Sequence, residues 1–143
     1  MMKKKGGFTL VELLAVIGVV GVILAVVLVG SSSARNTAKI STTAQQIQLI
    51  YGACQSWLGN GRTNYSGISL STLQDAGYLP STLNNPFGGT YSVSANATNN
   101  TQVDIQATQI PNNNIHQEIA SALGNVLSAN SYNASTKTST FTF

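Results

Sequence analysis

The sequence has few charged side chains and few groups that could carry out chemistry. Only 8% of its 143 residues are charged, against about 25% in ordinary soluble domains. Cys54 is the one cysteine and His116 the one histidine, so an intrachain disulfide is excluded. Zinc sites need several such ligands. We therefore expect no enzyme activity, with no catalytic residues, no metal and no cofactor.

The few reactive groups have structural interpretations. We expect Cys54 to be a small buried hydrophobic residue and His116 to lie at the surface or half-buried. A nucleophilic pair of these two residues would require them to be neighbours. Asp75 and Asp104 lie near asparagine-rich loops and could contribute to a calcium site, but turn formation explains those loops better.

The net charge of +3 comes from the N-terminus. Three of the seven basic residues occupy positions 3–5, and without them four bases balance four acids. Outside this leader the only close basic pair is Arg35 and Lys39. A dedicated nucleic-acid site would need a basic stripe or patch, and none is expected here.

Residues 8–30 form an apolar run of 23 residues in which Glu12 is the only charged member. As a helix the run would span roughly 35 Å, enough to cross the hydrocarbon core of a membrane. The lysines that precede it should remain cytoplasmic. No small-residue cleavage site of the secretory kind closes the run, whereas Gly6 and Gly7 stand before it.

Glu12 needs an explanation because a carboxylate in lipid costs several kcal/mol and is usually paired. It could lie near the interface, or be protonated. Alternatively, it pairs with a positive group of a neighbouring helix. Cleavage between Gly7 and Phe8 would remove the lysines and create such a group, the α-amino group of Phe8, four residues from Glu12.

Residues 3–14 closely resemble the class III signal of type IV pilins and pseudopilins: three lysines, Gly6, Gly7, Phe8, and a glutamate four residues after the phenylalanine. The resemblance implies that a prepilin peptidase cuts after Gly7 and N-methylates Phe8. It also implies that Phe8 and Glu12 act in subunit assembly. Residues 1–7 would then be a leader peptide.

The helix is expected to continue from residue 31 to residue 58 as an amphipathic helix. Gly18 and Gly21 could allow close helix packing or add flexibility, and Gly30 with the following serines is a candidate bend. No proline precedes Pro80, so a proline kink is not expected. Apolar residues recur every three or four positions at Ala38, Ile40, Ala44, Ile47, Tyr51, Cys54 and Leu58.

Residues 59–143 are expected to form a globular α+β domain. Residues 59–61 should end the long helix and 71–77 form a short one. Alternation predicts an antiparallel hairpin of strands 89–95 and 102–108. A second helix is predicted over 114–127, with Ile115, Ile119, Leu123 and Val126 on one face. A polar stretch, 128–136, and a last strand, 138–143, follow.

The predicted fold is the α+β type IV pilin fold, a long N-terminal helix packed on a small antiparallel sheet with an additional helix. Residues 50–111 also resemble PilS-like type IVb pilins, through residues 50–52, 73–80 and 85–89. Two features depart from that group: the disulfide usual near the C-terminus is impossible here, and the short leader before Phe8 is typical of type IVa pilins and pseudopilins.

The resemblance implies a structural subunit that polymerises through its apolar helix into a type IV pilus. The precursor would wait in the bacterial inner membrane and end in a filament at the cell surface. Implied partners are copies of the chain, a prepilin peptidase, an assembly ATPase and a platform protein. The alternatives are a type II secretion or competence pseudopilin, which forms a short periplasmic filament, and a signal-anchored binding module that never polymerises.

Overall fold

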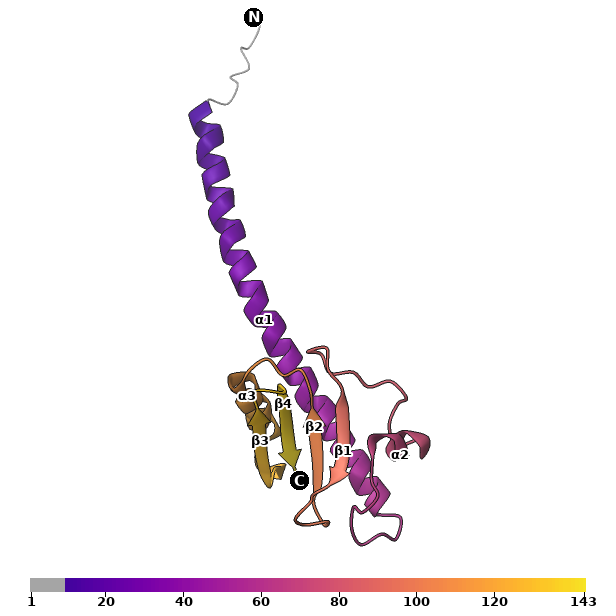
Figure 1. Cartoon of the computed structure of the whole chain (residues 1–143). Coiled ribbons are helices and arrows are strands. Elements are labelled where there is room, and N and C mark those ends of the chain that lie inside the picture. The colour runs from indigo at the N-terminus through magenta and orange to yellow at the C-terminus, as the bar shows by residue number, and fades with distance from the viewer. Residues whose placement is uncertain (1–9) are drawn as a thin grey trace, which may run out of the picture. The chain divides into compact units, whose positions relative to one another are not determined.

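The computed structural model describes residues 10–143, and of residues 26 and 28–31 only the backbone. The chain divides into two compact units, Met1–Thr37 and Ala38–Phe143. Helix α1, Leu10–Leu58, contributes residues to both units (Figure 1). Its backbone stays helical through residues 30–33, so the expected weak point does not break the helix. Its second half belongs to the globular unit.

The globular unit contains two further α-helices and one four-stranded sheet. Helix α2 is Leu70–Asp75 and α3 is Asn113–Leu123. A 3₁₀ turn, η1, follows α3 at Gly124–Val126. The strands are β1 Tyr91–Ala95, β2 Val103–Ala107, β3 Ala129–Asn133 and β4 Thr138–Thr142. They pair in the order β1-β2-β4-β3, each pair antiparallel.

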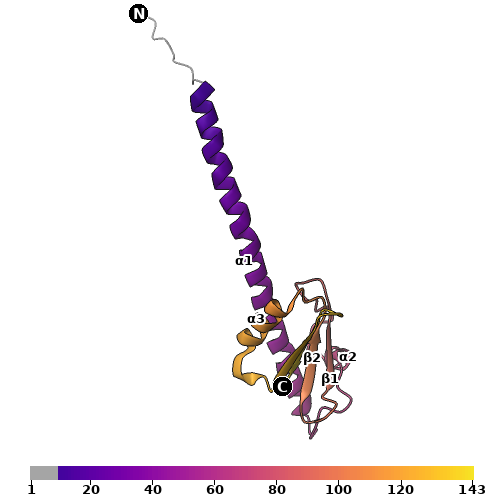
Figure 2. The same ribbon diagram turned by 60° about the vertical axis from the view of Figure 1, so that its left-hand side comes forward.

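The predicted hairpin is confirmed. Tyr91 pairs with Ala107, and Val93 with Ile105, in the register that alternation implies. These side chains are buried, whereas the residues between them face outward. Within the globular unit, α1 and α3 lie on the same side of the sheet, while α2 lies beside β1 (Figures 1 and 2).

The second half of α1 packs its apolar stripe into the domain core. Ile47, Ile50 and Cys54 are fully buried, and Trp57 is nearly so. Ala38 is exposed, so the stripe begins at Ile40 and the expectation for Ala38 was wrong. Helical spacing of apolar residues does not by itself show at which residue of α1 the contact with the domain core begins.

One polar contact fixes this part of α1 against the sheet, and others fix the loop that precedes β1. The Tyr91 hydroxyl donates a hydrogen bond of 2.7 Å to Gln46 Oε1. Buried Asn85 donates through Nδ2 to the carbonyl of Thr108 at 2.8 Å and accepts from the backbone of Phe87 at 3.0 Å. Because these bonds use groups that would otherwise be buried without partners, they specify one position of the loop.

The C-terminal strand is held without a disulfide. Strand β4 lies between β2 and β3, and Phe143 exchanges two backbone hydrogen bonds with Val103, at 3.0 and 3.1 Å. Phe141 is fully buried, and the Phe143 ring stacks on Tyr51 of α1 with centroids 4.3 Å apart. Hydrogen bonds and packing therefore hold the C-terminal strand in place.

Three expectations for residues 114–136 are corrected by the structure. Helix α3 ends at Leu123 because Gly124, with φ +66°, terminates it, and Val126 is 50% exposed. The polar stretch 128–136 contains strand β3. His116 is 1% exposed rather than at the surface. Its ring stacks on those of Tyr132 and Phe141, and its Nε2 lies 2.9 Å from Asn130 Oδ1.

Candidate functional site

The first half of α1 presents apolar side chains in every direction. Twelve large hydrophobic residues between positions 10 and 27 are 48% to 77% exposed in the single chain. Successive residues of a helix point about 100° apart, so these positions leave no polar face. An apolar surface this large marks an interaction surface. We call residues 10–27 the apolar stem.

Glu12 is the only charged residue between positions 10 and 34. It lies in the first turn of α1 and its side chain is exposed. A carboxylate near a helix N-terminus is favoured by the helix dipole. If another apolar helix covered the stem, this carboxylate would lose water and would need a positive partner.

The predicted packing glycines leave room on the stem. An added Cβ at Gly18 or at Gly21 would meet nothing within 4 Å. An open hollow of about 270 Å³ lies nearby, lined by Ala15, Val16, Val19 and Val20. Small residues let helix backbones approach closely, and nothing in the described chain obstructs such an approach at Gly18 or Gly21.

Part of the predicted site lies outside the described residues. This applies to the cleavage-site Gly7 and to Phe8, the predicted site of methylation and partner of Glu12. It also applies to the surroundings of Gly30. The cleavage, the methylation and the Phe8–Glu12 pairing therefore stay predictions. In the described part of the chain, the structure contains no helix with the length and apolar character that crossing a membrane requires.

The reactive groups of the globular unit are held in structural roles. Cys54 is buried, and desolvation raises the pKa of its thiol to about 12, an effect that a backbone hydrogen bond opposes only in part. Thiolate nucleophiles depend on a lowered pKa, so the Cys54 thiol is not suited to act as a nucleophile. Asp104 accepts a hydrogen bond of 2.7 Å from the Thr142 hydroxyl. Within residues 10–143, no cluster of three or more metal-ligating side chains occurs.

The sequence did not point to an open polar hollow of about 400 Å³ on the sheet. Its residues come from three strands and one turn, including Ser131 and Asn133 of β3. Since residues 128–136 were described only as a polar stretch, with no strand predicted there, these side chains could not be placed beside β4. The sequence could have indicated this hollow only if β3 had been predicted as a strand.

An apolar stem followed by an amphipathic half-helix that packs on a four-stranded antiparallel sheet is the type IV pilin fold. Residues 2–28 match the prokaryotic N-terminal methylation motif, and residues 37–140 match the PilS N-terminal family. The second match spans more than half of the chain, so the chain belongs to this family of type IV pilin-like proteins. Searches of curated proteins and of solved structures gave no match. Membership points to a structural protein rather than an enzyme.

Proposed function

We propose that the chain is the main subunit of a type IV pilus on the bacterial surface. After removal of residues 1–7, copies polymerise through residues 8–30 into a helical filament. The observation that carries this proposal is the apolar stem, exposed on all sides in the single chain, in a protein whose N-terminus matches the methylation motif.

Before assembly, the apolar run of residues 8–30 would be covered by the lipid of the inner membrane. Assembly would exchange lipid for the stems of other copies. Apolar surface stays buried in both states, so the transfer has little net hydrophobic cost. The proposal requires a prepilin peptidase for processing, and an assembly ATPase with its platform protein to drive the transfer.

Within the filament, the α-amino group of Phe8 in one subunit would pair with the Glu12 carboxylate of another. An ion pair in a bundle of apolar helices is stabilising only if both charges find partners, because each charge is costly alone. The pair would therefore fix the axial offset between neighbouring subunits, because any other offset leaves both charges without a partner. The exposed first-turn position of Glu12 supports this role.

The match of residues 37–140 to the PilS family supports a pilus subunit. The alternative is a pseudopilin of a secretion or competence system, which has the same fold but forms a short periplasmic filament. The short leader before Phe8 is compatible with that alternative. A signal-anchored module that never polymerises would instead keep residues 1–7.

One experiment tests processing and polymerisation together. Surface fibres are sheared from cells that produce the protein, and the intact mass of their main component is measured. We expect long fibres whose subunit begins at Phe8 and carries one added methyl group. A main component that retains Met1 or Met2 would refute the processing. Correctly processed protein found only in the cell envelope, with no sheared fibres, would favour the pseudopilin.

A further inference from the structure

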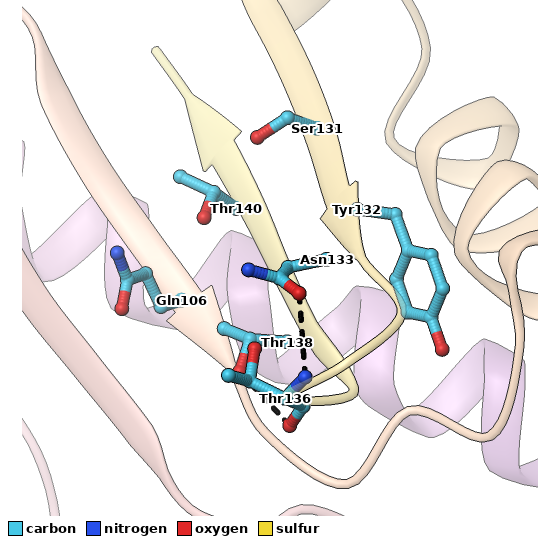
Figure 3. Close-up of a pocket in the computed structure, with 7 residues that line it drawn as sticks. All are labelled: Gln106, Ser131, Tyr132, Asn133, Thr136, Thr138 and Thr140. Atoms are coloured by element: carbon cyan, nitrogen blue, oxygen red, sulfur yellow. Dashed lines mark hydrogen bonds between the residues drawn. The ribbon is translucent and has the colours of Figure 1, made fainter.

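The face of the sheet opposite α1 and α3 carries the hollow of about 400 Å³ described above. Its volume lies near the lower end of the range for small-molecule sites, roughly 300–1,000 Å³. Figure 3 shows Gln106 on one side of the β4 threonines, with Ser131 and Asn133 on the other. The lining consists of Gln106, Ser131, Tyr132, Asn133, Thr136, Thr138 and Thr140. The Tyr132 ring points away from the other side chains (Figure 3) and stacks on His116 of α3.

Several lining groups have hydrogen-bonding capacity that the folded chain does not use. Among the described residues, the hydroxyls of Thr140 and Ser131 take part in no hydrogen bond. The amide nitrogens of Gln106 and Asn133 likewise donate none, although Gln106 Oε1 accepts from Ser92 at 3.4 Å. Register places Thr140 opposite both Gln106 and Ser131, so these donors and acceptors gather over one part of the sheet.

The hollow is also held in shape. Asn133 Oδ1 accepts from the backbone of Ser135 at 3.0 Å and of Thr136 at 3.3 Å, which fixes the β3–β4 turn. The other lining positions stand on paired strands. A site built on rigid elements loses little conformational entropy when a ligand binds.

No side chain that lines the hollow is ionisable near neutral pH. On the same face, Asp104 is occupied by Thr142 and by Asn96, whose amide lies 3.0 Å from its carboxylate. Lys137 is exposed in the adjoining turn but does not line the hollow. Hydroxyls and amides without a fixed charge match a ligand that is itself rich in hydroxyl groups and uncharged.

We propose that this hollow binds one residue of a neutral saccharide. Binding by an open, fully polar site is expected to be weak for one subunit, with a Kd on the order of 1 mM. If the chain polymerises as proposed above, a fibre would repeat the site along its length. Weak single-site binding would then become strong attachment to a glycan surface through avidity.

The test uses the full-length subunit, solubilised in dodecylphosphocholine so that no sugar detergent competes. Saturation-transfer difference NMR is recorded with lactose, maltose and N-acetylglucosamine, and with glucuronic acid as the anionic probe. We expect saturation transfer to at least one neutral sugar. Thr140→Val and Gln106→Met should each weaken this binding about threefold to tenfold, the usual effect of losing one hydrogen bond. Fibre formation is not required, so the result is independent of the proposed polymerisation.

Ser94→Ala is the matched control, since it removes a hydroxyl from an exposed position of β1 on the same sheet but outside the hollow. It should leave sugar binding unchanged. Fluorescence of the single tryptophan, Trp57, verifies that each variant is folded. Three results would overturn the proposal: no transfer to any neutral sugar, equal binding by Thr140→Val and Gln106→Met, or stronger binding of glucuronic acid, which would assign the interaction to Lys137.

Discussion

The two halves of helix α1 share one backbone conformation but differ in how their side chains are buried. In the apolar stem, residues on all sides of the helix are apolar and exposed. Between Ile40 and Trp57, the apolar residues form one buried stripe, with Leu49 as an exposed exception, whereas Gln45, Gln48 and Gln55 on the other side are exposed. The second half of α1 thus buries its apolar stripe against the rest of its own chain.

This difference separates two sources of stability. The second half of α1 belongs to the fold, because the core cannot close without Ile47, Ile50 and Cys54. The stem adds no side chain to that core. Burial of its apolar surface is stabilising, but only lipid or other copies of the chain can bury it, because the single chain does not. Changes in the two halves should therefore affect different measurements.

The largest effect is expected at the single charge of the stem. Glu12→Ala should reduce the yield of sheared fibres by more than about tenfold, because it leaves the Phe8 amine buried without a partner, a loss of about 3–5 kcal/mol for a buried pair. The amount of membrane-inserted subunit should stay unchanged. Fibre yield is measured by electron microscopy and by gel analysis of the sheared fraction.

Val11→Ala is the control for this change, as it shortens an exposed neighbour in the same turn without altering charge. It should leave the fibres nearly normal. Wild-type fibre yield from Glu12→Ala would remove the pairing role, and equal losses in both variants would show that the stem surface in general, rather than the charge, is sensitive.

A matched isoleucine pair sharpens the comparison. Ile47→Ala should lower the free energy of unfolding of the globular unit by about 2–5 kcal/mol, because it opens a cavity in the core. Ile17→Ala, at a position 63% exposed, should change it by less than about 0.5 kcal/mol. Urea unfolding of the detergent-solubilised subunit, followed by Trp57 fluorescence, measures both. A large loss for Ile17→Ala would mean that the stem takes part in the fold.

Sequence patterns predicted the elements that depend on local periodicity. The β1–β2 hairpin follows from strict alternation at Tyr91, Val93 and Ala95 against an equally regular partner. The end of α1 at Leu58 follows from the glycines at 59 and 61, the second of which has φ +81°. The methylation motif is also local, since it is a set of residues within one short segment.

Features fixed by partner elements rather than by the segment's own periodicity were not predictable in this way. Strand β3 consists of Ala, Asn, Ser, Tyr and Asn, of which only the tyrosine favours strands, and its position is set by pairing with β4. His116 looks like a surface residue, but Asn130, Tyr132 and Phe141 enclose it. The polar hollow required the same missing strand. In each case the residue types of the segment itself give no signal of the contacts that fix it.

The last predicted effect appears only at high pH and concerns the ionisable thiol that the second half of α1 buries. Burial raises the pKa of Cys54 from 9.0 to about 12, so the folded state favours the neutral thiol. The free energy of unfolding should keep its full value below pH 9 and fall as the pH rises from 9 to 12, by at most about 1.4 kcal/mol per pH unit for this group. Urea unfolding across that pH range measures the slope.

Cys54→Ala separates this contribution from that of Tyr91, whose pKa is also raised by burial, from 10.0 to about 12. Without the thiol, the decline should begin nearer pH 10 than pH 9, because only tyrosines then lose a proton earlier in the unfolded chain, among them Tyr91 and Tyr65, whose pKa values burial raises. The variant should start from a lower stability, since a small side chain leaves a space in the core. An identical decline between pH 9 and pH 10 in both proteins would mean that Cys54 is not buried as a neutral thiol. The two halves of α1 would then differ less than the structure indicates, because the second half would also expose its ionisable group.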